Sequence, residues 1–286
     1  MRITSIESSP FHELPYSNVA GGEARKVVTV RLPFFRATVD SLPQSVEAIL
    51  VAADLQGRER MAAEPRMLGE VLAEELCAMG CRRLLPPAER IGVILAGDLY
   101  SYPDLHKRGG SGDVRPVFRA FARVCKWVVG VAGNHDMFGV TAPALDIAAF
   151  QRESGVHLLD GNVAELCGLK IAGVSGVIGN PKKPFRRDER SFSEEVKRLA
   201  AQSPDLLVLH DGPDVPAQGL MGWPSIRAAL ESVAMPAPLV VRGHAHWDAP
   251  LATLAHDIQV LNVDSRVVVL QRAADCQGKV RAPGRP

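Results

Sequence analysis

The chain has 286 residues, of which 47% are hydrophobic and 23% charged, and its formal net charge is +1. This balance is that of an ordinary globular protein and excludes disordered and fibrous classes, while a nucleic-acid coat protein would be far more basic. No run of about 18 uncharged apolar residues occurs, so we expect no membrane span. The N-terminal segment also lacks the apolar core of a signal peptide.

The cysteines are scattered, odd in number and form no Cys-x-x-Cys pair. Sets of cysteines that pair in disulfide bonds are typical of secreted proteins. The scattered pattern here instead predicts reduced thiols in a cytoplasmic protein. The residues concerned are Cys77, Cys81, Cys125, Cys167 and Cys276.

Short apolar runs recur along the chain. Val27–Val39 is predicted to be an extra strand or hairpin ahead of the core. The runs that follow are rich in Val, Ile and Leu and mostly do not alternate with polar residues, which is typical of strands covered on both faces. They span residues 48–53, 91–96, 127–132, 169–174, 206–209 and 239–241. Residues 258–263 and 266–271 resemble a hairpin that turns at Asp264 and Ser265.

Helical patterns lie between these runs. The expected helices span residues 67–79, 116–124, 143–154, 191–202 and 224–233. Gly80 is predicted to end the first of these helices, and Ser191 and Glu194 form a capping box for the fourth. A proline begins each of the other three. Strands alternating with helices predict an α/β layered domain. We expect one domain over residues 1–286, with a strand extension at 1–46, a catalytic core at 47–270 and a flexible tail at 271–286.

Five of the predicted strands are each followed by a metal-capable side chain. The side chains concerned are Asp54 and Gln56 after the first run, Asp98 after the second, Asn134 after the third, His210 after the fifth, and His244 with His246 after the last. Open α/β sheets bind ligands at the carboxyl ends of their strands. Any one of these residues alone would be explained as a turn residue, a helix cap or a core histidine. The recurrence instead predicts that they meet at one edge of the sheet.

The residue types form a coherent set of metal ligands. Carboxylate and amide oxygens mixed with imidazole nitrogens suit Mn²⁺, Fe, Zn²⁺ or Ni²⁺ better than Ca²⁺. Seven candidates are too many for one tetrahedral ion, but they fit two ions about 3.5–4 Å apart that share a carboxylate. His244 and His246 are two residues apart, so an extended backbone would point both to the same side.

The motifs DLQG, GDLY, GNHD, LHDG and GHAH, in this order, resemble the signature of the calcineurin-like metallophosphoesterases over roughly residues 47–270. The resemblance implies a four-layer αββα sandwich with two metals at the edge of its central sheets. It assigns the first metal to Asp54, Gln56, Asp98 and His246, and the second to Asn134, His210 and His244, with Asp98 as the bridge. It also implies that His135 stabilises charge at the scissile phosphate or protonates the leaving oxygen.

Two positions depart from the family pattern. Gln56 stands where the first motif normally has histidine, and its neutral amide oxygen favours Mn²⁺, with Fe, Zn²⁺ or Ni²⁺ as alternatives. A branch that resembles Mn²⁺-dependent ADP-ribose and CDP-alcohol phosphohydrolases also has glutamine there. Ser101 stands where the family often has the aspartate that orients the catalytic histidine, which leaves Asp104 or Asp136 for that role.

The resemblance implies a hydrolase that attacks a phosphomonoester, a phosphodiester or a nucleotide pyrophosphate with a metal-bridging hydroxide. The substrate would be a phosphorylated small molecule, a nucleotide or a nucleic acid, and the sequence indicates no oligomeric state. The alternative is a non-catalytic scaffold or binding module of the same fold. His135 argues against that alternative, because a scaffold needs no acid for a leaving group.

A basic segment follows the run at 169–174 and contains Lys182, Lys183, Arg186, Arg187 and Arg190. One interpretation is a solvated loop whose charges pair with Asp188 and Glu189. In the other, Arg186 and Arg187 bind a substrate phosphate, since a guanidinium fork matches phosphate oxygens.

Overall fold

The computed structural model describes residues 1–20, 26–107, 110–139, 143–233 and 236–273. The α-helices are α1 (Leu68–Cys81), α2 (Arg115–Val124), α3 (Pro143–Phe150), α4 (Glu189–Ala200) and α5 (Pro224–Glu231). Short 3-10 helices are η1 (Ala88–Arg90), η2 (Pro216–Gln218) and η3 (Ala255–Asp257).

The strands form two large sheets and two short two-stranded ones. The first large sheet has the order β1-β3-β18-β4-β5-β7-β9, with β2 paired to β3, and the second has the order β10-β11-β14-β15-β17-β16. The strands of the first sheet are β1 (Ile3–Ile6), β2 (His12–Val19), β3 (Val27–Val39), β4 (Ala48–Ala52), β5 (Ile91–Leu95), β7 (Trp127–Gly130), β9 (Val156–Leu158) and β18 (Val267–Arg272). Those of the second are β10 (Asn162–Leu166), β11 (Leu169–Val174), β14 (Leu206–Leu209), β15 (Leu239–Arg242), β16 (Leu251–Thr253) and β17 (Gln259–Asn262). The short sheets pair β6 (Gly112–Asp113) with β8 (Asp136–Met137) and β12 (Val177–Ile178) with β13 (Arg186–Arg187).

The central strands of both sheets run parallel. β4, β5, β7 and β9 are parallel neighbours in the first sheet, and β11, β14, β15 and β17 are parallel neighbours in the second. Because the carboxyl ends of parallel strands share one edge, the loops after these strands emerge together within each sheet.

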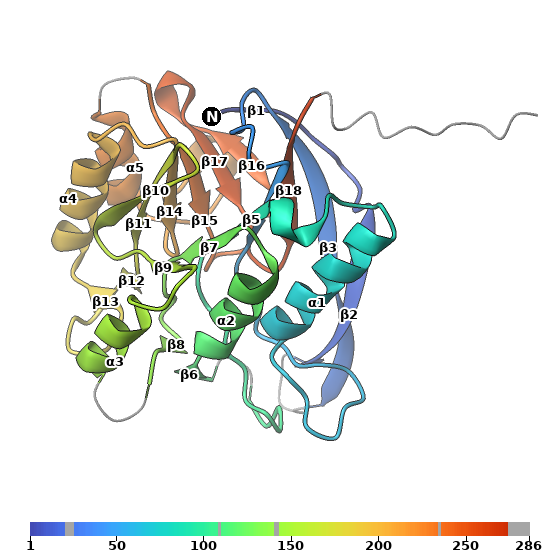
Figure 1. Cartoon of the computed structure of the whole chain (residues 1–286). Coiled ribbons are helices and arrows are strands. Elements are labelled where there is room, and N and C mark those ends of the chain that lie inside the picture. The colour runs from blue at the N-terminus through green and yellow to red at the C-terminus, as the bar shows by residue number, and fades with distance from the viewer. Residues whose placement is uncertain (21–25, 108–109, 140–142, 234–235, 274–286) are drawn as a thin grey trace, which may run out of the picture.

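The central strands of each sheet are buried on both faces, and three apolar cores lie between the layers. Figure 1 shows α1 and α2 on one side of the sheets and α4 and α5 on the other. Leu50 of β4 packs toward α1 and α2, whereas Ile49 and Val51 pack against the second sheet. The outer face of the second sheet packs against α4 and α5, where Phe192 and Ile226 are fully buried. Helices therefore cover the outer face of each sheet, which explains why the strands read as continuous apolar runs. The predicted α/β class is confirmed.

The predicted hairpin around Asp264 and Ser265 is wrong. Both strands exist, but β17 pairs with β15 and β16 in the second sheet, whereas β18 lies between β3 and β4 in the first. Both strands are mostly buried on two faces, but burial of the faces does not determine which strands pair at the edges. The segment that joins them crosses from one sheet to the other.

Several boundaries also differ from the expected ones. α1 continues through Gly80 to Cys81, so this glycine does not end the helix. α4 begins earlier than predicted, because Asp188 is its N-cap and accepts a hydrogen bond from the Ser191 amide at 3.0 Å. β18 extends to Arg272, within the segment expected to be a tail, and the rest of that tail from residue 274 lies outside the described residues.

The remaining expectations concern the thiols and the membrane. Cys77, Cys81, Cys125 and Cys167 are free, as predicted, and Cys276 lies outside the described residues. None of the helices in the described ranges has the length and apolar character needed to span a bilayer.

Candidate metal centre

Three of the predicted ligands form a compact group. Asp98 follows β5, His210 follows β14 and His244 follows β15, and one ligand atom from each lies within 4.8 Å of the other two. Asp98 follows a strand of the first large sheet, whereas His210 and His244 follow strands of the second. The two sheets therefore meet at this edge, and a residue set that is far apart in the sequence offers one carboxylate and two imidazoles to a common point.

Two buried polar atoms at this edge lack a partner. The Oδ1 atom of Asn134 and the Nε2 atom of His210 have no hydrogen-bond partner among the described residues. His210 Nε2 does lie 3.4 Å from Asp98 Oδ2, but without the geometry of a hydrogen bond. A buried polar atom without a partner costs about 1–3 kcal/mol. Both atoms belong to residues that the sequence predicts as ligands of the second metal, and a bound cation would give each of them a partner.

The orientation of His210 also fits metal binding. Its Nδ1 atom donates to the carbonyl oxygen of Ala96 at 2.7 Å, so Nε2 is the nitrogen that faces Asp98. Metal-binding histidines usually donate their other N–H to a carbonyl or carboxylate in this way, which fixes the tautomer.

The backbone at three predicted ligands is left-handed. Asp54, Asp98 and His244 have φ angles of 54°, 55° and 66°. Such a conformation costs a non-glycine residue about 1–3 kcal/mol and tends to occur at functional sites. Hydrogen bonds hold the segments in place, because Asp54 Oδ2 accepts from the His244 amide at 2.9 Å and Asp98 Oδ1 accepts from the His135 amide at 3.0 Å.

Glycines let these loops approach each other. A Cβ atom on Gly133 would lie 2.0 Å from Asp98 Oδ1, and one on Gly243 would lie 2.5 Å from Asp54 Oδ2. The glycines of the GNHD and GHAH motifs are therefore required by the close packing of neighbouring loops, in addition to any role in turns.

Negative charge is crowded at the site. Burial raises the pKa of Asp54 well above its ordinary value, and the carboxylates of Asp264 and Asp98 add to this effect against the opposing effect of His210. Burial lowers the pKa of His210, but the carboxylates of Asp98 and Asp54 and the carbonyl oxygen of Ala96 together outweigh it and raise that pKa to about 10. A divalent cation bound here would offset this negative charge.

Asp54, Gln56 and His246 line a cavity of about 290 Å³ together with Asp98 and His244 of this group, whereas Asn134 and His210 are not among its lining residues. Gln56 donates its amide to Asp98 Oδ2 at 3.1 Å, so its Oε1 atom is the one left for a metal. The residues that line the cavity are Asn18, Asp54, Gln56, Asp98, His135, His244, His246, Asp264 and Ser265. Asn18, Asp264 and Ser265 were missed by sequence reasoning. Asn18 belongs to β2, outside the expected core, and the other two were assigned to a turn.

His135 lines the same cavity. Neither of the acids that were expected to orient its ring, Asp104 and Asp136, forms a hydrogen bond with that ring. Asp104 is exposed and pairs with His106 at 2.6 Å. Asp136 is buried and accepts backbone N–H groups from Asp98, Leu99 and Gly133 at 2.7–2.9 Å. The hydroxyl of Ser111 lies 3.3 Å from His135 Nδ1. The Asp136 carboxylate instead joins the loop that carries Asp98 to the loop that carries Asn134.

The basic segment does not line this cavity. Arg187 pairs with Asp160 at 2.5 Å, and Arg190 pairs with Glu194 at 2.7 Å along α4. Arg186 contacts the carbonyl oxygen of Pro184 at 3.3 Å. These contacts favour the interpretation of a salt-bridged surface segment, but the partners are Asp160 and Glu194 and not the predicted Asp188 and Glu189.

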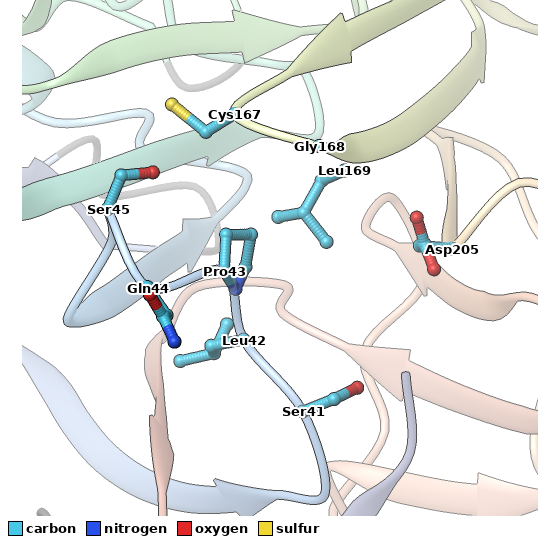
Figure 2. Close-up of a pocket in the computed structure, with 9 residues that line it drawn as sticks. All are labelled: Ser41, Leu42, Pro43, Gln44, Ser45, Cys167, Gly168, Leu169 and Asp205. Carbon is cyan, nitrogen blue, oxygen red and sulfur yellow. The ribbon is translucent and has the colours of Figure 1, made fainter.

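A larger cavity, of about 540 Å³, lies at the opposite edge of the sheets (Figure 2). Ser45 precedes β4, Leu169 begins β11 and Asp205 precedes β14, so this cavity is at the amino ends of the strands. The Asp205 carboxylate already accepts the Lys170 amide at 2.9 Å. The residues that line this cavity include one acid, one thiol and no histidine, so they do not form a comparable group of ligands.

Comparisons with known proteins give little beyond the fold. No family model and no curated protein matches the sequence. A solved crystal structure that carries no protein name aligns with 77% of this chain and 90% of its own at 10% identity and a TM-score of 0.51, a likeness of fold alone. The phosphopantetheinyl hydrolase of Mycobacterium tuberculosis aligns with 85% of this chain and 99% of its own at 15% identity, with a TM-score of 0.43. A hypothetical protein from Thermus thermophilus aligns with 75% of each chain at 14% identity and a TM-score of 0.42. TM-scores below 0.5 add nothing to the case for a function.

Proposed function

We propose that this chain is a metal-dependent phosphoesterase of the calcineurin-like type, with a single catalytic domain of four αββα layers. The observation that supports this most strongly is the group of Asp98, His210 and His244, in which the Nε2 atom of His210 is buried without a hydrogen-bond partner. The Oδ1 atom of Asn134, another predicted ligand, is also buried without a partner. The order of the five motifs along the chain is consistent with the same function.

The donor set fits two divalent ions that share Asp98. One ion would be held by Asp54, Gln56, Asp98 and His246, and the other by Asp98, Asn134, His210 and His244. When bound, such ions supply Lewis-acid polarisation of the phosphate and a water of lowered pKa. The neutral amide of Gln56 makes the first site richer in oxygen, which favours Mn²⁺ over Zn²⁺.

The chain's own residues supply the remaining chemistry. His135 lines the cavity and donates a proton to the leaving oxygen, a contribution typically worth about 10²–10⁴-fold. Ser111 lies beside its Nδ1 atom, so Nε2 is the nitrogen that would face the substrate. Asp136 keeps the Asp98 and Asn134 loops in register through its three backbone hydrogen bonds. The substrate would be a phosphorylated small molecule or a nucleotide.

The test is hydrolysis of nitrophenyl mono- and diesters and of nucleotides by the purified chain after metal removal and addition of Mn²⁺. We expect Mn²⁺-dependent turnover of at least one ester, and an Asp98→Asn variant prepared in parallel should lose it. A scaffold would bind metal without turnover. Equal rates in both preparations would point to a contaminating phosphatase and contradict the proposal.

A further inference from the structure

The segment that crosses between the two sheets contacts the GHAH loop at three successive residues. Asn262 Nδ2 donates to the Ala245 carbonyl oxygen at 2.8 Å. Asp264 Oδ2 lies 2.7 Å from His246 Nδ1, and Arg266 Nη2 donates to the Trp247 carbonyl oxygen at 2.5 Å. Alternate residues of one segment thus bind consecutive residues of the other.

These three contacts come from buried side chains. Asn262, Asp264 and Arg266 are 0%, 8% and 6% exposed, whereas the imidazole of His246 is 60% exposed. The segment is also internally braced, since Asn262 Oδ1 accepts the Asp264 amide at 3.1 Å and Arg266 Nε donates to the Asp264 carbonyl oxygen at 3.3 Å. A buried acid in a hydrogen-bonded segment therefore contacts a largely exposed imidazole.

The contact with Asp264 determines which nitrogen of His246 is free. A carboxylate only accepts hydrogen bonds, so Nδ1 carries the proton and Nε2 keeps its lone pair in the neutral ring. A carboxylate bound to the far nitrogen also fixes the ring orientation and raises its basicity as a ligand. The second acid near this ring, Asp248, is fully exposed and lies 3.8 Å from Nε2, so it provides no comparable anchor.

We propose that Asp264 is a positioning residue of the metal centre, which holds His246 in the tautomer that presents Nε2 to a metal, within a clamp completed by Asn262 and Arg266. This inference rests on the proposed metal site. The sequence assigned Asp264 to a hairpin turn, but the crossing between sheets places it at the carboxyl edge instead.

The first test needs no metal. Long-range ¹H–¹⁵N spectra of the metal-free chain, recorded near pH 8.5 where an ordinary imidazole is neutral, report which nitrogen of His246 carries the proton. The resonance is assigned from its loss in His246→Gln. We expect Nδ1 to be protonated in the wild type and the Nε2-protonated form to increase in Asp264→Asn. Protonation of Nε2 in the wild type would overturn the proposal without recourse to any variant.

The second test is titration of each metal-free chain with Mn²⁺. Loss of a carboxylate behind a ligating histidine typically weakens metal binding about 10–100-fold, and we expect this for Asp264→Asn. Asp248→Asn removes the same charge from the other side of the ring and serves as the matched control, with an expected change below about 3-fold. Equal losses in the two variants would mean a general charge effect and would overturn the positioning role.

The two readouts separate this inference from the proposed function. If the wild type binds no Mn²⁺ but its His246 shows the predicted tautomer, the positioning contact stands and the metal site fails. If Mn²⁺ binds equally well to the wild type and Asp264→Asn, the metal site stands and the positioning role fails.

Discussion

Replacing Gly133 by alanine tests whether the packing of two loops creates the metal centre. The added Cβ atom would lie 2.0 Å from Asp98 Oδ1 and 2.4 Å from the Asp98 amide nitrogen. Neither atom can easily move away, because Oδ1 accepts the His135 amide and the Asp98 amide donates to Asp136. Ordinary contact begins near 3.4 Å, so the loops must separate by about 1.4 Å, the difference between 3.4 Å and 2.0 Å.

The size of this displacement allows us to predict its effects on stability and on the rate of hydrolysis. Overpacking of this kind costs about 1–3 kcal/mol of folding free energy, and a misplacement of about 1 Å at a reacting centre costs about 10²-fold in rate. We expect Gly133→Ala to remain folded, to bind Mn²⁺ more weakly and to lose at least about 10²-fold in kcat/KM. Calorimetric titration and a nitrophenyl diester assay at several Mn²⁺ concentrations measure these effects.

The control is Gly168→Ala in the turn between β10 and β11. Gly168 has a φ of 86°, and no atom lies within 4 Å of the position that an added Cβ would take, so alanine there brings backbone strain without a clash. That strain costs about 1–2 kcal/mol, a loss of stability similar to that of Gly133→Ala but remote from the site. Wild-type Mn²⁺ affinity in Gly133→Ala would refute the reasoning, as would equal losses of affinity in both variants.

Three further predictions concern individual side chains. His135→Gln should keep its Mn²⁺ but lose about 10²–10⁴-fold in turnover, with a smaller loss for nitrophenyl esters than for alkyl esters, and equal losses would argue against a proton donor. Gln56→His should bind metal more tightly and respond better to Zn²⁺, whereas unchanged affinity in titration would mean that Gln56 is not a ligand. Asp136→Asn should lower the free energy of unfolding of the metal-free chain by at least about 1.5–3 kcal/mol, the value of one hydrogen bond to a charged group, and an unchanged denaturation midpoint would contradict its bracing role.

The sequence predicted the central strands well because their signal is local. Residues 91–96 and 206–209 are apolar on both faces, and β5 and β14 lie there. The side chains after these strands could also be placed, since parallel strands deliver their carboxyl ends to one edge. This is why Asp98 and His210 were expected to be neighbours although they lie 112 positions apart in the sequence.

Strand partners were not predictable in the same way. An apolar run indicates that a strand is buried but not which strands flank it, so β17 and β18 were paired with each other although they lie in different sheets. Asp264 was consequently assigned to a turn. The strand that carries Asn18 was also missed. Its sequence, HELPYSNV, contains several polar residues because only part of its surface is buried, so it does not form an apolar run.

Backbone geometry at the site was also beyond the sequence. Asp54, Asp98 and His244 adopt left-handed φ angles although none is a glycine. Most non-glycine residues avoid this conformation, and contacts between loops, such as that of the His244 amide with Asp54, help to hold it. Sequence patterns describe local preferences, so they fail where tertiary contacts override them.

We propose that this edge of the two sheets binds two divalent ions that share Asp98. The most direct measurement is the number of Mn²⁺ ions bound at equilibrium by the metal-free chain and by Asp98→Asn. We predict two ions per wild-type chain and a loss or marked weakening of both in the variant, because one carboxylate serves both sites. Binding of two ions with unchanged affinity by Asp98→Asn, or no binding by the wild type, would contradict the account.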